Sequence, residues 1–199
     1  MHWQQFQAMM KKRFEDFINH RVKNPREDEV EAILAIFSVE HLDKGELFKE
    51  GHTVIRNLGF LAEGSARSYF INEKGHEITT DILQKDSFLS DIISVRTDAK
   101  SPMVIEVLEK STVLVAPMNK VWDLLDHNVT FNILIREYIG DQAMELVKRH
   151  LMFLNGSSTE RYQYITETNP EILQKFPLKF IASMIGVTQT QLSRIRNEK

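Results

Sequence analysis

The spacing of hydrophobic residues changes three times along the chain. At the start these residues recur every three or four positions, the period of one helical face: Trp3, Phe6, Met10, Phe14, Phe17 and Ile18. A second helix is predicted over residues 26–37. Pro25 precedes it, and its first turn is acidic, which suits the positive end of the helix dipole. The chain is therefore expected to begin with two helices.

Residues 38–117 show short apolar runs separated by turns, many of them at glycines. Residues 66–71 and 77–83 are predicted strands, and 104–108 with 112–116 are predicted to pair as a hairpin. Several short strands at this spacing favour a β-barrel or β-roll. With helices on both sides, the predicted fold class is α+β.

The helical period returns after residue 120, with a short helix at 121–125 and a long one at 130–154. The long helix has a possible seam with a nearly seven-residue rhythm: Ile133, Gly140, Met144, Val147, Leu151 and Leu154. Such a seam favours pairing with a second copy of the chain, and the alternative is packing on its own domain. A hinge is predicted at 155–158, then a short helix over 159–167, a turn at 168–170 and a final helical pair.

Composition narrows the functional classes. The 199 residues carry 25 basic and 28 acidic side chains, a net charge of −3, and no cysteine. The lack of cysteine excludes disulfide scaffolds, iron–sulfur clusters and thiol catalysis. No apolar run approaches the roughly 18 residues of a membrane span, and the start has no secretory pattern. The expectation is a soluble, cytoplasmic protein without membrane contact.

The last 22 residues have the pattern of a helix-turn-helix. Ala182 is small where two helices would cross, and Gly186 suits a turn that needs a positive φ. Apolar Leu192 and Ile195 would bury the second helix, and Thr188 can cap its start. These positions together predict the motif more strongly than any one of them alone.

The second helix of this motif would expose polar side chains that suit bases and phosphates. Glutamine can read adenine edges and arginine can read guanine. The predicted DNA-binding residues are Thr188, Gln189, Thr190, Gln191, Ser193, Arg194, Asn197 and Lys199. The segment has four cations and one acid, +4 − 1 = +3, so the rest of the chain carries −6. The alternative is a structural helical hairpin with a solvated polar face.

A β-roll, a long helix and a terminal helix-turn-helix, in that order, resemble the Crp/Fnr family of bacterial transcription regulators. Its glycine-bearing turns are matched by residues 44–51, 64–69 and 73–77, and residues 158–162, 176–182 and 192–196 resemble the Bacteroidetes branch. The resemblance implies N-terminal helices with a cyclic-nucleotide-binding-like double-stranded β-helix at 1–129, which would sense an effector. It further implies a dimerisation helix at 130–154 and a DNA-binding domain at 158–199.

The resemblance also locates an effector cassette. The matching positions are Phe88, Ser90, Asp91, Lys100 and Ser101. Members that bind cyclic AMP carry Gly, Glu and Arg where this chain has Ser90, Asp91 and Lys100. Lysine lacks the bidentate fork of arginine, which disfavours the usual cyclic AMP pose. Another small anion or metabolite, or an empty pocket, are the alternatives, and Asp91 with Lys100 could equally form a solvated loop pair.

Family members usually continue into a β-hairpin wing, whereas this sequence stops at Lys199, so a domain without a wing is expected. The resemblance implies double-stranded DNA and a second copy of the chain as partners, with RNA polymerase a further candidate. No metal site is predicted, because the histidines are scattered, and no catalytic motif points to an enzyme. The leading hypothesis is a homodimeric DNA-binding regulator. The alternative is a ligand-binding or interaction module whose terminal helix pair is structural.

Overall fold

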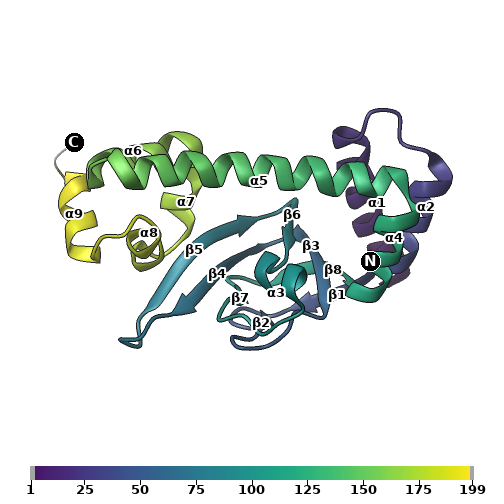
Figure 1. Cartoon of the computed structure of the whole chain (residues 1–199), viewed down its shortest axis with the longest axis horizontal. Helices are drawn as coiled ribbons and strands as arrows, with labels where there is room; N and C mark the ends of the chain where they lie inside the picture. Colours follow the sequence, from purple (N-terminus) through teal and green to yellow (C-terminus); the bar gives the residue numbers. More distant parts are fainter. Residues whose placement is uncertain (1–2, 198–199) are drawn as a thin grey trace. The chain divides into compact units, whose positions relative to one another are not determined.

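The computed structural model describes residues 3–197 (Figure 1). Two helices come first, α1 (Trp3–Arg21) and α2 (Glu27–Ile36). The strands, with one short helix among them, are β1 (Ser38–Leu42), β2 (Leu47–Lys49), β3 (Asn57–Glu63), β4 (Ser65–Ile71), β5 (Glu77–Gln84), β6 (Ser87–Leu89), α3 (Ile92–Thr97), β7 (Val104–Val107) and β8 (Ser111–Pro117). The remaining helices are α4 (Met118–His127), α5 (Val129–Asn155), α6 (Ser158–Thr168), α7 (Pro170–Lys175), α8 (Leu178–Met184) and α9 (Gln189–Asn197). This order confirms the predicted α+β class.

The chain forms two compact units. The first holds Met1–Ser68 and Leu83–Ile139, and the second holds Tyr69–Ile82 and Gly140–Lys199. Strands β4 and β5 and helix α5 therefore contribute residues to both units. Among the described helices, none is long and apolar enough to cross a membrane.

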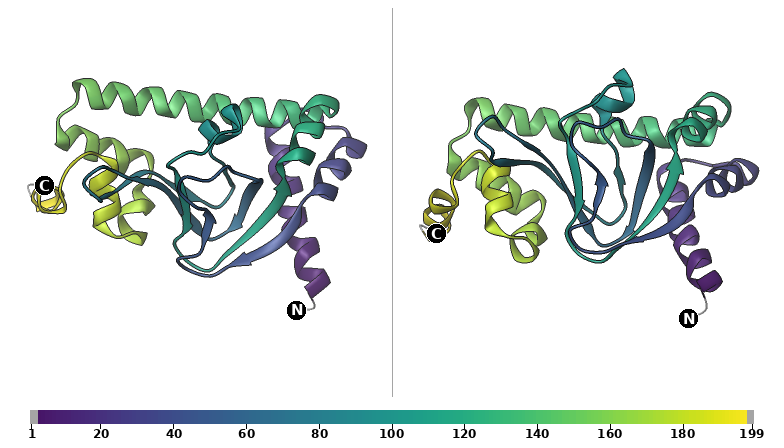
Figure 2. Two further views of the ribbon diagram at one scale, coloured as in Figure 1. Left: turned by 60° about the horizontal axis from the view of Figure 1, so that its bottom comes forward. Right: turned by 90° about the horizontal axis from the view of Figure 1, so that it is seen from below.

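The strands form two four-stranded sheets, in the orders β1-β8-β3-β6 and β2-β7-β4-β5. Figure 2 shows the strands of the first unit curving around one another into a roll. The predicted hairpin of residues 104–108 and 112–116 is wrong, because β7 and β8 lie in different sheets. The turn between them is held to the start of β4 instead, where Leu108 N donates to Ser65 O at 2.8 Å. Hydrophobic spacing indicates a strand but not its neighbour.

The core of the first unit is an aromatic cluster between α1 and the roll. Phe14 of α1 stacks on Phe60 of β3, with ring centroids 4.4 Å apart, and meets Phe37 edge-on at 4.9 Å. Phe88 lies 5.5 Å from Phe60 and 4.9 Å from Tyr138 of α5. Such pairs contribute about 0.5–1.5 kcal/mol each beyond the area they bury. The helical face predicted from Trp3 to Ile18 thus packs on the roll.

The start of α5 is anchored by an acid from α2. Glu29 Oε2 accepts hydrogen bonds from Thr130 Oγ1 at 2.6 Å and Thr130 N at 3.0 Å, and Oε1 accepts from Val129 N at 3.3 Å. These bonds, above all that from the Thr130 hydroxyl, lower the pKa of the Glu29 carboxyl. Asn128 Oδ1 accepts from Phe131 N at 2.8 Å. The first amides of the helix are therefore satisfied by side chains.

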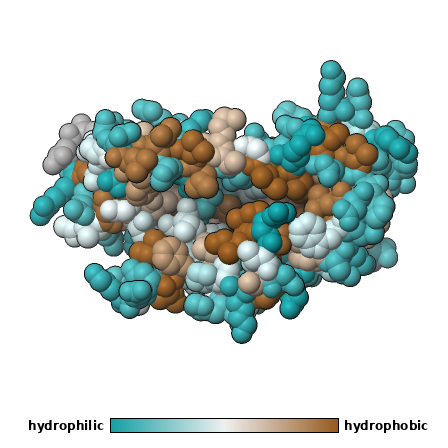
Figure 3. All heavy atoms as spheres, viewed as in Figure 1, coloured by the Kyte–Doolittle hydropathy of each residue, from teal (hydrophilic) through white to brown (hydrophobic). Residues whose placement is uncertain are grey.

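The second half of α5 exposes a row of large apolar side chains. Seven between Ile139 and Leu154 are 45–65% exposed: Ile139, Met144, Leu146, Val147, Leu151, Phe153 and Leu154. Figure 3, in the view of Figure 1, shows brown, apolar residues on the surface along the course of α5. Four of the six predicted seam residues belong to this row.

The chain bends tightly between α5 and α6, where the sequence predicts a hinge. Gly156 N donates to Met152 O at 2.8 Å, and a Cβ on Gly156 would lie 2.6 Å from that oxygen. Ser157 then starts α6 with a capping box, in which Glu160 Oε2 accepts from Ser157 N at 2.7 Å. The turn predicted at 168–170 is shorter in the structure, because α6 extends to Thr168 and Pro170 already begins an additional short helix, α7.

Candidate nucleic-acid interface and effector cassette

Helices α8 and α9 form the helix-turn-helix that the sequence indicates. Ala182 is buried in α8, and Leu192 and Ile195 bury the inner side of α9. Gly186 has a φ of +70°, a left-handed conformation that glycine adopts without the penalty of a Cβ. The turn between the helices closes where Val187 N donates to Ala182 O at 2.9 Å. The small and apolar positions thus have the packing that the motif requires.

A reciprocal cap fixes the start of α9. Thr188 Oγ1 accepts from Gln191 N at 3.2 Å, and Gln191 Oε1 accepts from Thr188 N at 2.9 Å and from Thr188 Oγ1 at 3.0 Å. This is the capping-box arrangement of a threonine followed three residues later by a glutamine. Thr188 caps the helix as predicted. Gln191 was expected only to contact DNA, and its amide oxygen serves this cap.

The outer face of α9 is polar and exposed. The exposed residues among those predicted to bind DNA are Thr188, Gln189, Thr190, Gln191, Ser193, Arg194 and Asn197. Arg196 is exposed beside them, and residues 178–197 contain three cations and no acid. Lys199, the remaining predicted DNA-binding residue, lies outside the described residues. A helix with such a face can enter the major groove and present these side chains to base edges and phosphates.

The second unit holds the helix-turn-helix against other elements. Ser183 Oγ of α8 accepts from Thr79 N of β5 at 3.1 Å, and Arg149 of α5 donates to Thr80 O at 3.1 Å. Burial raises the pKa of the Asp81 carboxyl. The positive charge of Arg149, whose Nη1 is 3.5 Å from Asp81 Oδ1, acts in the opposite direction and lowers this pKa. The first part of β5 is therefore bonded both to α8 and to α5.

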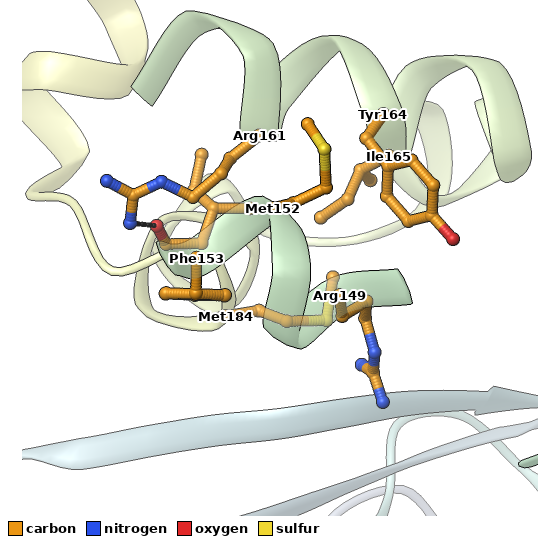
Figure 4. Close-up of a pocket in the computed structure, with 8 residues that line it drawn as sticks. Arg149, Met152, Phe153, Arg161, Tyr164, Ile165 and Met184 are labelled. Carbon is orange, nitrogen blue, oxygen red and sulfur yellow. Dashed lines mark hydrogen bonds between the residues drawn. The ribbon is translucent and has the colours of Figure 1, made fainter. Parts of the chain in front are cut away.

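A small pocket lies between α5, α6 and the end of α8 (Figure 4). It has about 20 Å³ of space, room for one water molecule. Its lining is Arg149, Met152, Phe153, Arg161, Tyr164, Ile165, Met184 and Ile185. The Tyr164 hydroxyl donates to the Glu145 carboxylate at 2.8 Å. Burial, and to a smaller extent this hydrogen bond, raises the pKa of Tyr164 to about 12. The pocket is too small for a nucleotide.

The cassette residues in the first unit are not brought together as one open site. Phe88 belongs to the aromatic core, and its N donates to the Tyr138 hydroxyl at 3.1 Å. Ser90 is half-buried and the Lys100 side chain is exposed. Ser101 is fully buried, and its carbonyl accepts from His52 N at 2.7 Å.

Asp91 is neither solvated nor paired with Lys100, so the predicted loop pair is wrong. Its Oδ1 accepts from Ile93 N at 3.2 Å and Ser94 N at 3.3 Å, which caps α3. Its Oδ2 lies 3.2 Å from Lys49 Nζ, and both side chains are only 2% exposed. A buried acid needs such a partner because an isolated buried charge is costly.

The sequence did not identify Lys49 as a candidate site residue, although it is buried and pairs with Asp91 of the cassette. Its Nζ donates to Met103 O at 2.7 Å and Glu50 O at 3.1 Å, in addition to its contact with Asp91. No local pattern marks it, since it lies 42 positions from Asp91 in a three-residue strand. A second ion pair between residues distant in the sequence lies in the same roll, where Arg67 and Glu106 are 2.6 Å apart. The chain thus pairs each of these charges with an opposite charge of its own, although Asp91 Oδ2 lacks a hydrogen-bond partner among the described residues.

Comparison with known proteins gives one family match, over less than half of the chain. Residues 39–128 match the family model of the cyclic nucleotide-binding domain. Among curated proteins, none matches the chain.

Solved structures extend the likeness beyond the roll. One is described as a Crp/Fnr-family transcriptional regulator from Eubacterium rectale, 14% identical with a TM-score of 0.68 over 87% of this chain and 82% of that one. A mutant of CooA from Carboxydothermus hydrogenoformans is 16% identical, with a TM-score of 0.66 over 83% and 77%. The catabolite activator protein of Thermus thermophilus is 15% identical, with a TM-score of 0.56 over 92% and 85%.

These findings confirm the resemblance seen in the sequence. Residues 39–128 match the model of the cyclic nucleotide-binding domain, and the fold of the chain is similar to that of a solved Crp/Fnr-family regulator. At these identities the structural likeness establishes the fold, while the ligand and the partners have to be argued from the residues.

Proposed function

We propose that the protein is a DNA-binding transcriptional regulator of Crp/Fnr type rather than an enzyme. The observation that carries the proposal is the outer face of α9, exposed and polar, with Arg194 and Arg196 and no acidic residue in 178–197. Glutamine, arginine and asparagine on one helical face match the donor and acceptor patterns of the major groove. RNA polymerase is a candidate partner of such a regulator.

The regulator acts as a homodimer through α5. Large apolar side chains 45–65% exposed along one helix are unusual on a monomer, and Met144, Val147, Leu151 and Leu154 keep a near-heptad spacing. A second copy of the same helix would bury them. Two copies of α9 would then read half-sites about one helical turn of DNA apart.

The roll is a sensor domain whose cassette is altered. Asp91 stands where members that bind cyclic AMP carry Glu, but it already caps α3 and pairs with Lys49. The Lys100 side chain is exposed and lacks the fork with which arginine holds a phosphate. A small ligand other than cyclic AMP, or no ligand, fits these residues better.

The second candidate function is an interaction module whose terminal helices are structural. The hydrogen bond from Thr79 N of β5 to Ser183 Oγ of α8 favours this alternative, because it gives α8 a structural contact. That contact uses α8 and leaves the outer face of α9 exposed. DNA binding therefore remains the better account of the exposed face.

The experiment is selection of bound sequences from a pool of random duplex DNA by the full-length protein. The regulator should enrich one motif with two half-sites about 10 base pairs apart. Gln189→Ala and Arg194→Ala should lower affinity for the enriched duplex, and Arg136→Ala, an exposed arginine early in α5, should not. Lack of enrichment, or unchanged binding by both α9 variants, would reject the regulator in favour of the interaction module.

A further inference from the structure

We propose that Arg161 of α6 is a positioning residue that fastens the turn before α9 to the last turn of α5, so that the orientation of the DNA-reading helix follows the dimer helix. The inference rests on the proposed function, because it concerns how α9 is aimed. Arg161 belongs to neither the outer face of α9 nor the effector cassette.

The first evidence is the pair of contacts that the guanidinium makes. Arg161 Nη1 donates to Ile185 O at 2.9 Å, drawn as a dashed line in Figure 4. The guanidinium carbon lies 4.8 Å from the centroid of the Phe153 ring in the last turns of α5. One planar group thus contacts the end of α8 and the end of α5 at the same time. The ammonium group of a lysine lacks the planar geometry that makes both contacts.

The second evidence is the lack of space at the turn. A Cβ added to Gly186 would lie 3.0 Å from Phe153 Cε1 and 3.2 Å from Arg161 Nη1. The turn is therefore seated directly on the ring and the guanidinium. Because Gly186 also has a φ of +70°, two independent constraints disfavour a side chain there.

The third observation is that the segments on both sides of the Arg161 contact are held by hydrogen bonds and helix caps. On one side, Gly156 N is bonded to Met152 O and Ser157 caps α6, which fixes where α6 leaves α5. On the other side, the cap between Thr188 and Gln191 starts α9 two residues after Gly186. A shift of the end of α5 would therefore be passed to α9 through bonded contacts rather than lost in a loose loop.

Arg161 is placed to hold the turn, not to bind DNA. Its Nη1 is used by Ile185 O and its Nε is buried. The salt dependence of DNA affinity can therefore distinguish a positioning residue from a residue that contacts phosphate. A residue that neutralises a phosphate changes the slope of log K against log salt by about 0.9, whereas a positioning residue changes affinity without changing that slope.

The test compares Arg161→Lys and Arg161→Ala with wild type on the enriched duplex and on random duplex, over a range of salt. Both variants should bind the enriched duplex about tenfold more weakly, because without this bond α9 is held in the binding orientation for a smaller fraction of the time. They should bind random duplex almost as wild type does, with an unchanged salt slope. Arg136→Ala is the matched control and should change neither quantity.

A readout without DNA accompanies it, namely amide hydrogen exchange of residues 186–192 in the free protein. Exchange there should accelerate in Arg161→Lys and in Phe153→Leu, which keeps an apolar side chain but removes the ring beneath the guanidinium. The double variant should add little to either single one, since both break the same contact. Phe153→Leu also keeps the inference testable if Arg161→Ala fails to fold.

The outcomes separate the inference from the function on which it rests. A smaller salt slope in Arg161→Ala, or unchanged exchange together with unchanged affinity, would overturn the positioning role. If wild type selects no DNA motif, the proposed function fails, and the exchange of residues 186–192 still decides whether Arg161 holds the turn.

Discussion

In the first unit, the side chains of Asp91, which caps α3, and Lys49 of β2 are each only 2% exposed and lie 3.2 Å apart. The polar residues along α9 in the second unit are at the surface instead. Each region carries a charge that the resemblance links to a ligand, Asp91 in the roll and Arg194 on α9. In the roll these charges are used by the protein itself, and on α9 they are presented outward. The position of a charged residue in a motif therefore matters less than whether the fold has already given it a partner.

The largest expected effect comes from breaking the buried pair. Lys49→Met should destabilise the protein by about 3–5 kcal/mol, because it leaves the Asp91 carboxylate buried without its cation. The free energy of unfolding in urea measures this. Lys12→Met, which removes a 60% exposed lysine from a surface pair with Asp16, is the control and should change it by less than about 1 kcal/mol.

The double variant Lys49→Met with Asp91→Asn sharpens this prediction. Removing both charges should recover part of the loss, since the cost lies in the unpaired charge. Equal losses for the single and double variants would show that the pair is a packing element, and the contrast with α9 would weaken.

An intermediate effect is expected at the cap of α9. Thr188→Ala should destabilise the second unit by about 1 kcal/mol, because the amide of Gln191 loses its acceptor. Unfolding followed by amide exchange in α9 measures it. Thr190→Ala, also exposed but outside the cap, should stay within about 0.5 kcal/mol. Equal effects at both positions would mean that the cap does not set the start of the helix.

Glu29 gives a smaller, pH-dependent effect in the first unit. Its pKa is lowered in the folded state, so its ionised form contributes stability above the unfolded-state pKa. That contribution should fade as the pH falls through the ordinary glutamate range to the folded-state value. Wild type should therefore lose more stability on acidification than Glu29→Gln. Parallel curves for the two proteins would contradict the anchoring role of Glu29 at α5.

No effect is predicted for cyclic nucleotides on the roll. A ligand present at about 100 times its Kd would raise the free energy of unfolding by about 2.7 kcal/mol. Cyclic AMP and cyclic GMP should leave the unfolding temperature of wild type unchanged, because Asp91 is buried and already paired with Lys49. A stabilisation by either nucleotide would show that the cassette opens and would erase the difference between the two regions.

The same two regions show how far the sequence could predict the structure. The helix-turn-helix was predictable because its determinants are local: Gly186 has the expected φ, and Thr188 and Gln191 are three residues apart. The cassette was not, because the partner of Asp91 is Lys49, in another strand and without a periodic signal. The wrong hairpin of β7 and β8 has the same cause, since pairing between strands depends on long-range contacts.

The central claim is that the outward charges of α9 read DNA. The most direct measurement is the affinity of wild type and Arg194→Ala for the enriched duplex and for duplexes substituted at single positions. Arg194→Ala should lose about 1–3 kcal/mol on the enriched duplex and lose base preference at one position. Equal affinity of the two proteins for every duplex would contradict the claim.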